Sequence, residues 1–306
     1  MLTRGFVTIA TGDDKYYNLA YNLLRTYRKY ASDSIPFALI CDRHTPQADA
    51  FDQVILMDAP NCSYMDKLLL YRYSPFDETI FIDADSLIMA DPHCIWDHFS
   101  SADDISCYGC IHPLDSDKAW FTYEGTGKYK SSIEYLIDLH GGIYYFRKTD
   151  RCVSIFETAI ELANHYHQYS FRHFDHPADE PVIAISLAIH HSIPCTRPMQ
   201  LLFIPSYWGK VHVDIRGQVY VNKSPLSTPI LHFGTDNTNR FLYRYLVQVL
   251  INTTSTDYLC HILKYLSLRI RTAPIECKVI FTHNIGSILR KCLPESVVNR
   301  IKRIMI

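Results

Sequence analysis

The first 90 residues alternate short apolar runs with amphipathic segments, and this order constrains the fold more than any other feature. Residues 15–30 repeat apolar side chains at helical spacing, and residues 67–73 predict a shorter helix. Four runs rich in β-branched and aromatic residues predict buried strands: 5–10, 37–41, 54–57 and 79–82. Strands and helices in this order are typical of an α/β domain with a mixed, mainly parallel sheet.

Three of the predicted strands end in polar residues, at the edge where α/β sheets bind their ligands. These ends are Thr11-Gly12-Asp13, Asp42-Arg43 and Asp83-Ala84-Asp85. The chain has neither the glycine-rich dinucleotide fingerprint nor the phosphate-binding P-loop motif. We therefore expect a ligand site at this edge that does not depend on either glycine-rich motif.

Asp83 and Asp85 stand one residue apart, directly after a strongly apolar strand. Side chains at i and i+2 of an extended segment point to the same side, so both carboxylates can reach one cation. Paired carboxylate oxygens suit Mg²⁺ or Mn²⁺. The spacing alone leaves a second interpretation open, in which both acids are solvated and only cap the next turn.

The composition excludes several classes of protein. With 48% hydrophobic residues and a net charge of -2, the chain is neither disordered nor a generic nucleic-acid binder. Of the 10 cysteines only Cys107 and Cys110 form a C-x-x-C pair, and a zinc site needs a second one. The sequence shows no signal peptide and no apolar run long enough for a transmembrane helix, so we expect a cytoplasmic protein.

Five segments between residues 5 and 236 resemble glycosyltransferase family 8 in type and order. They are Ala10–Tyr16, Ile80–Met89, Leu139–Phe146, Asp179–Val182 and Leu231–Gly234. The resemblance implies a Rossmann-like glycosyltransferase A fold over residues 1–240, followed by a basic helical extension over 241–306. It also implies a nucleotide-sugar donor, most often a UDP-sugar, and a divalent cation, Mn²⁺ or Mg²⁺.

The same resemblance assigns roles to individual residues. The metal ligands would be Asp83, Asp85 and His232. The donor would contact Thr11, Asp13, Tyr16, Lys67, Ala84, Gly141, Gly142, Gly234 and Arg240, with Tyr16 a candidate to stack on the base. The catalytic candidates are Asp179 and Glu180, which would orient the donor sugar or stabilise an oxocarbenium-like transition state, and His140, which either hydrogen-bonds the sugar or is structural.

The sequence departs from the family pattern at three places. His140 stands where the family has Asn, and Glu180 stands where it has Gln. The late motif has Gly234 one position early and lacks a phosphate-binding Lys, for which Arg240 or Lys210 is a candidate replacement. Asp179 and Glu180 also fit an ordinary helix start, where acids are favoured by the helix dipole.

The last 67 residues carry about 11 basic and about 3 acidic side chains. A predicted helix from Pro294 sets apolar residues beside Arg300, Lys302 and Arg303. This helix either lies on an anionic membrane surface or docks on the domain.

The expected activity is retaining transfer of a hexose to a glycan or lipid-linked acceptor, with no nucleic-acid partner. Two alternatives stay open. One is an inverting enzyme on the same fold, with Asp179 or Glu180 as base. The other is a degenerate domain that binds nucleotide or glycan as a scaffold.

Overall fold

The computed structural model describes residues 3–32, 35–99, 104–172, 176–194, 202–205, 211–214, 218–251 and 265–275. The chain divides into two compact units, each of which packs mainly against itself. The first comprises Met1–Pro205 and Ser227–His232, and the second comprises Ser206–Leu226 and Phe233–Ile306. Gly234 and Arg240 belong to the second unit, and all other predicted site residues belong to the first.

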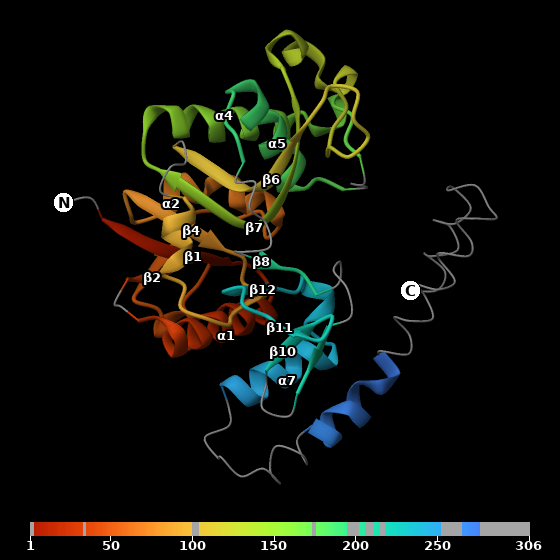
Figure 1. Cartoon of the computed structure of the whole chain (residues 1–306). Helices are drawn as coiled ribbons and strands as arrows, with labels where there is room; N and C mark the ends of the chain where they lie inside the picture. Colours follow the sequence, from red (N-terminus) through yellow and green to blue (C-terminus); the bar gives the residue numbers. More distant parts are fainter. Residues whose placement is uncertain are drawn as a thin grey trace. The chain divides into compact units, whose positions relative to one another are not determined.

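A six-stranded mixed sheet forms the centre of the first unit (Figure 1). Its strands, in spatial order, are β3 (Gln53–Leu56), β2 (Phe37–Cys41), β1 (Arg4–Ala10), β4 (Glu78–Ile82), β7 (Leu136–Arg147) and β6 (Ile105–His112). The first four run parallel, whereas β7 is antiparallel to both β4 and β6. The apolar runs of β1, β2 and β4 are buried because the sheet is covered on both faces.

Helices pack on the two faces of this sheet. Figure 1 shows α1 (Asp14–Tyr30) on one side, and α4 (Asp150–Asn164) and α5 (Asp179–Ile189) on the other. Side-chain caps begin α1 at Asp13 and α4 at Thr149. The core on the second side contains Phe146, Phe156 and Val182, with the Phe146 and Phe156 rings 5.6 Å apart.

A second, three-stranded sheet brings residues from distant parts of the chain together. Its order is β5 (Ser86–Ile88), β12 (Ile230–His232) and β8 (Leu202–Phe203). β12 is antiparallel to β5, with His232 opposite Ser86. This register sets His232 beside the residue that follows Asp85.

Short elements complete the first unit. They are η1 (Ala48–Ala50), η2 (Tyr64–Leu69), α2 (Leu70–Tyr73), α3 (Cys94–His98), η3 (Glu124–Ser132) and η4 (Tyr166–Gln168). The polar segment 100–130 contains β6 and part of η3. β7 is the longest of these strands, and it pairs with β4 on one side and β6 on the other.

The second unit contains a small antiparallel sheet and helices. The sheet consists of β9 (Val211–Val213), β10 (Val219–Val221) and β11 (Ser224–Pro225). After η5 (Thr235–Asn237), α7 (Phe241–Leu250) and residues 265–275 are helical, as predicted for this part of the chain. The predicted helix from Pro294 lies outside the described residues. Within the ranges that can be described, the helices are too short or too polar to cross a bilayer.

Candidate active site

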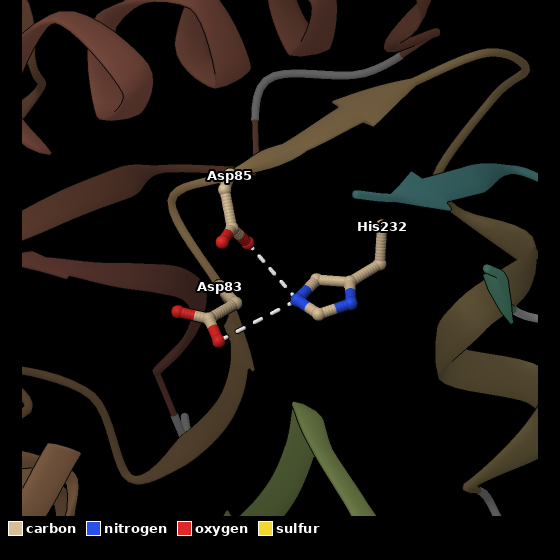
Figure 2. Close-up of side chains that lie close together, drawn as sticks. All are labelled: Asp83, Asp85 and His232. Atoms are coloured by element: carbon tan, nitrogen blue, oxygen red, sulfur yellow. Dashed lines mark ion pairs between the residues drawn. The ribbon is translucent and has the colours of Figure 1, made fainter. Parts of the chain in front are cut away.

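Three side chains converge beyond the carboxyl end of β4 (Figure 2). Asp83 and Asp85 come from the turn between β4 and β5, and His232 ends β12. The His232 Nε2 atom lies 2.9 Å from Asp85 Oδ1 and 3.6 Å from Asp83 Oδ2. One ligand atom from each residue lies within 4.8 Å of the other two. The three predicted metal ligands are therefore brought together.

This donor set fits a divalent cation. In octahedral coordination at about 2.1 Å, neighbouring ligand atoms are about 3 Å apart, which is close to the observed separations. The Nε2 atom of His232 is buried without an aligned hydrogen bond, although it faces both carboxylates. Two carboxylates and one imidazole are a set that suits Mn²⁺ or Mg²⁺.

Without a metal, the positive charge of His232 compensates the negative charges of Asp83 and Asp85. Burial acts to lower the pKa of His232, but Asp85 and Asp83 outweigh it and raise the pKa to about 10. Burial acts to raise the pKa of Asp83, but Lys67 and His232 hold it well below its usual range. In the absence of metal at neutral pH, His232 is thus an imidazolium facing an ionised Asp83.

Lys67 connects the predicted metal ligands with the predicted catalytic residues. Its Nζ atom donates to Asp83 Oδ2 at 2.8 Å and to the carbonyl of Gly141 at 3.2 Å. Asp179 Oδ2 lies 3.6 Å from the same atom. The side chain is only 7% exposed, yet its pKa is raised, because Asp179 and Asp83 outweigh the effect of burial. Lys67 is therefore a buried cation shared by two carboxylates.

Asp179 and Glu180 occupy the first turn of α5 and are held by β7. The Tyr144 hydroxyl donates to Asp179 Oδ2 at 2.7 Å, and the Gly141 amide donates to Glu180 Oε1 at 2.7 Å. Burial raises the pKa of Asp179. Burial, followed by repulsion from Asp179, raises the pKa of Glu180 to about 7. Glu180 can therefore exchange a proton near neutral pH.

Gly141 and Gly142 are required by close packing at this point. A Cβ atom on Gly141 would lie 2.8 Å from Asp179 Oδ2 and 3.1 Å from Glu180 Cγ. A Cβ atom on Gly142 would lie 3.2 Å from the His232 ring. The Gly142 carbonyl also accepts from the Asp83 amide at 3.0 Å. The glycine pair thus lets β7 approach the carboxylates and the histidine.

His140 is a neutral ring packed against His232, one of the candidate metal ligands. Burial, followed by repulsion from His232, lowers its pKa well below the usual value. Its Nδ1 atom accepts from the Gly142 amide at 3.0 Å, so the proton of the neutral ring is on Nε2. The ring lies edge-on to His232 at 4.7 Å between centroids. His140 therefore presents a hydrogen-bond donor at this site.

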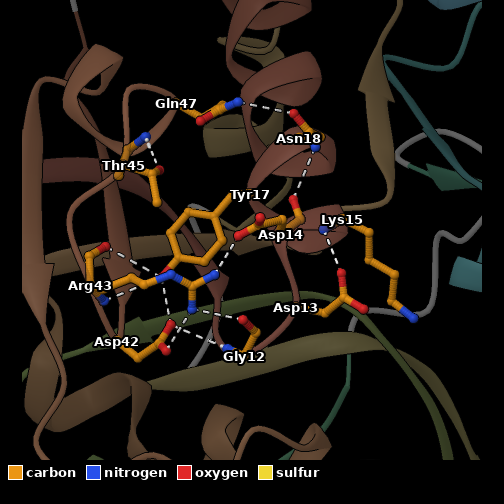
Figure 3. Close-up of polar contacts among 11 residues, drawn as sticks. Gly12, Asp13, Asp14, Lys15, Tyr17, Asn18, Asp42, Arg43, Thr45 and Gln47 are labelled. Carbon is orange, nitrogen blue, oxygen red and sulfur yellow. Dashed lines mark hydrogen bonds and ion pairs between the residues drawn. The ribbon is translucent and has the colours of Figure 1, made fainter.

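A polar network fixes the loop between β1 and α1 (Figure 3). The Tyr17 hydroxyl donates to Asp42 Oδ1 at 2.5 Å, and the Gly12 amide donates to the same atom at 3.2 Å. Arg43 donates to the Gly12 carbonyl at 2.7 Å and to Asp14 at 2.5 Å. Through these bonds Arg43 and Asp42 hold the shape of the loop. The same loop carries the residues predicted to contact the nucleoside.

The predicted nucleoside residues have the following local contacts. The Thr11 hydroxyl donates to the buried Asp66 at 2.9 Å, and Asp13 caps α1 by accepting from the Lys15 amide. Tyr16 is half-buried, with the Lys15 ammonium 4.8 Å from its ring centroid. Ala84 is buried between the two metal-ligand candidates. Their binding roles stay predictions.

Gly234 and Arg240 lie in the second unit. Gly234 has a φ of 69°, a conformation that favours glycine, and begins η5. Arg240 donates to the Asn237 side chain at 3.2 Å. Lys210 lies outside the described residues. The identity of the diphosphate cation stays a prediction.

Sequence reasoning missed Tyr144 and Asp66 as supporting residues, and it gave Arg43 only as part of a polar strand end. Tyr144 had a readable signal: it lies two positions after Gly142 in a strand, so its side chain shares a face with that glycine. Asp66 precedes Lys67 without any motif of its own. Its contact with Thr11 depends on packing between distant segments.

No protein-family model and no curated protein sequence matches the chain. Similar solved structures include the galactosyltransferase LgtC in complex with donor and acceptor sugar analogs, with 14% identity and a TM-score of 0.53. That match covers 83% of this chain and 98% of the other. An active-site mutant of LgtC, with glutamate replacing glutamine, matches with 14% identity, a TM-score of 0.52 and the same coverage.

The bifunctional glycosyltransferase WbbM also matches, with 10% identity and a TM-score of 0.50. This match covers 83% of this chain and 50% of that chain. At these identities the likeness concerns the fold. The mixed α/β architecture of the chain is the fold of these glycosyltransferases, so the predicted glycosyltransferase fold is confirmed.

Proposed function

We propose that the chain is a metal-dependent glycosyltransferase that moves a hexose from a UDP-sugar to a glycan or lipid-linked acceptor. The observation that carries this proposal is the convergence of Asp83, Asp85 and His232 beside a second acidic pair, Asp179 and Glu180. The fold supports it, because LgtC was solved with donor and acceptor sugar analogs.

Asp83, Asp85 and His232 would hold Mn²⁺ or Mg²⁺ next to the donor diphosphate. The cation would supply Lewis-acid chemistry, offsetting the negative charge that develops on the leaving nucleotide. Lys67 adds a fixed positive charge, which is bonded to Asp83 and lies within reach of Asp179. The nucleoside would contact the loop between β1 and α1, through Thr11, Asp13 and Tyr16.

The residues on the sugar side would stabilise the positive charge that develops on the donor sugar. The Tyr144 hydroxyl and the Lys67 ammonium orient Asp179, whose carboxylate would face positive charge developing at the anomeric carbon. His140 would donate through Nε2 to a hydroxyl or phosphate oxygen of the donor. We propose transfer with retention, with Asp179 and Glu180 as the groups nearest the reacting carbon.

An inverting reaction is the second candidate. It is favoured by Glu180, whose pKa of about 7 suits a general base that takes a proton from an acceptor hydroxyl. The anomeric configuration of the product, read by NMR, separates the two candidates.

A membrane-surface location would fit a lipid-linked acceptor. The helical residues 265–275 expose Leu266 and Ile270 together with Arg269 and Arg271. Apolar and basic side chains on one helix are the composition that binds anionic lipid. We propose peripheral binding at the cytoplasmic face of a membrane through this part of the chain and the basic residues that follow it.

The first test is nucleotide release from a panel of UDP-, GDP- and CMP-sugars with Mn²⁺. We expect release from one donor, and a loss of at least about 100-fold in Asp83→Asn and Asp85→Asn or with a chelator. Asp49→Asn, at an exposed carboxylate in η1, is the matched control and should keep the wild-type rate. If no donor is hydrolysed and none raises the melting temperature with Mn²⁺, the proposed transferase is wrong, and a scaffold that binds glycan becomes the better hypothesis.

A further inference from the structure

Two aromatic side chains form an exposed surface next to the candidate active site. Tyr64 is the first residue of η2 and is 48% exposed, and His176 is an exposed residue in the segment before α5. Their ring centroids lie 6.0 Å apart, and the ring planes meet at 34°. This pair, the Tyr64–His176 platform, has no role in the metal site or in the nucleoside loop described above.

The platform lies close to the groups proposed to act on the donor sugar. The Tyr64 ring centroid is 5.8 Å from Lys67 Nζ, which in turn lies 2.8 Å from Asp83 Oδ2 and 3.6 Å from Asp179 Oδ2. Because the three distances share one atom, the ring centroid lies at most about 9.4 Å from both carboxylate oxygens.

Polar contacts anchor the backbone that carries the two aromatic residues. Asp66, in the same 3-10 helix as Tyr64, is 1% exposed and accepts from the Asn61 amide at 2.7 Å and from the Thr11 hydroxyl at 2.9 Å. On the other side, the Tyr166 hydroxyl donates to the His176 carbonyl at 3.2 Å. A surface fixed in this way loses little conformational entropy when a ligand packs on it.

The chemistry of the platform fits a sugar ring. Aromatic faces are apolar with a negative electrostatic potential, so they pack against the C–H face of a pyranose while its hydroxyl groups stay in water. His176 precedes Asp179 in the same segment, so the platform flanks the sugar side of the site. The donor sugar is assigned to the buried groups Lys67 and Asp179, whereas the platform is exposed, so a sugar packed on the platform would be that of the acceptor.

We propose that Tyr64 and His176 form the acceptor subsite, with the terminal pyranose of the acceptor packed on the two rings. This inference rests on the proposed glycosyltransferase function, because it assigns the second substrate of that reaction. The subsite selects for a pyranose face without fixing its hydroxyl pattern.

The test measures the binding of simple glycosides by saturation-transfer NMR in the presence of UDP and Mn²⁺. The probes are methyl α- and β-D-glucopyranoside, methyl α- and β-D-galactopyranoside and lactose. We expect Tyr64→Ala to raise the glycoside Kd about tenfold and His176→Ala about threefold, whereas Tyr64→Phe keeps the ring and the affinity. Tyr30→Ala is the matched control, because Tyr30 ends α1, about 25 Å along the helix from its first turn.

Unchanged glycoside affinity in Tyr64→Ala, or the absence of binding by every probe to the wild type, would overturn the acceptor subsite. The UDP affinity of each variant, measured in the same samples, reports whether the donor side is intact. Failure of the proposed function is a separate result, since it would appear as absent nucleotide release from every donor while glycoside binding can still be measured.

Discussion

Binding of a divalent cation at Asp83, Asp85 and His232 is expected to release close to one proton. Without metal, the imidazole of His232 is held between two carboxylates, and its pKa is about 10 instead of 6.5. A metal ligand must be the neutral imidazole, so the cation has to displace this proton. Addition of metal is therefore the perturbation, and the release of this proton into the buffer is the quantity to measure.

The raised pKa fixes the size of the effect. At pH 7.5 the protonated ring is favoured about 300-fold, which weakens the apparent metal affinity by a similar factor. The affinity should rise about tenfold for each pH unit, hence about 100-fold between pH 6.5 and 8.5. The stabilising effect of the imidazolium on the metal-free fold is complete below pH 6.5, and it disappears as the pH rises through about 10.

Isothermal titration calorimetry with Mg²⁺ or Mn²⁺ in two buffers of different ionisation enthalpy measures the proton count directly. Glu180 has a pKa of about 7 and lies near His232, so the Glu180→Gln variant serves as a control that removes its contribution. We expect about one proton released in the wild type and in this control, and none in His232→Asn. Metal binding with no proton released between pH 6.5 and 8.5 would refute the reasoning.

Three further predictions concern the groups around the metal site. Arg43→Ala removes the bond to the Gly12 carbonyl, so the Kd for UDP should rise about tenfold in a titration while kcat is retained; a change in kcat alone would contradict this. Gly141→Ala sets a Cβ atom 2.8 Å from Asp179 Oδ2 and should lower nucleotide release about 100-fold without loss of metal binding in calorimetry. Glu180 binds a proton more tightly in the folded protein, so its contribution to stability is complete below about pH 4.5 and is lost as the pH rises through about 7. The free energy of unfolding should therefore fall by about 3 kcal/mol between pH 4.5 and 7 in urea titrations, and Glu180→Gln should remove this fall.

Local sequence patterns were sufficient to predict the strands and the helix that carry the candidate site residues. The buried runs of β1, β2 and β4 and the period of α1 follow from side-chain spacing, because one domain core covers them. The pair Asp83 and Asp85 was readable for the same reason, since it directly follows a strand. The glycosyltransferase fold was predicted from the order of motifs and is confirmed by the similar structures.

Long-range pairing could not be read from the sequence. β6 carries polar residues and Gly109, whose absent side chain allows the close approach of the Asp138 carbonyl on β7. The strand depends on this partner, so its own residues carry no clear strand pattern. In the same way, the contact between Lys67 and Asp179 joins η2 to α5, and no local pattern encodes it.

The pairing of β5 with β12 also has a consequence for how the protein is made. During synthesis the two aspartates and the central sheet leave the ribosome well before His232, whose strand belongs to the first unit but follows a segment of the second. Closing so long a loop is slow compared with local folding. The nascent chain therefore holds only two of the three candidate metal ligands until β12 docks, and the proposed metal site would be completed in one late step.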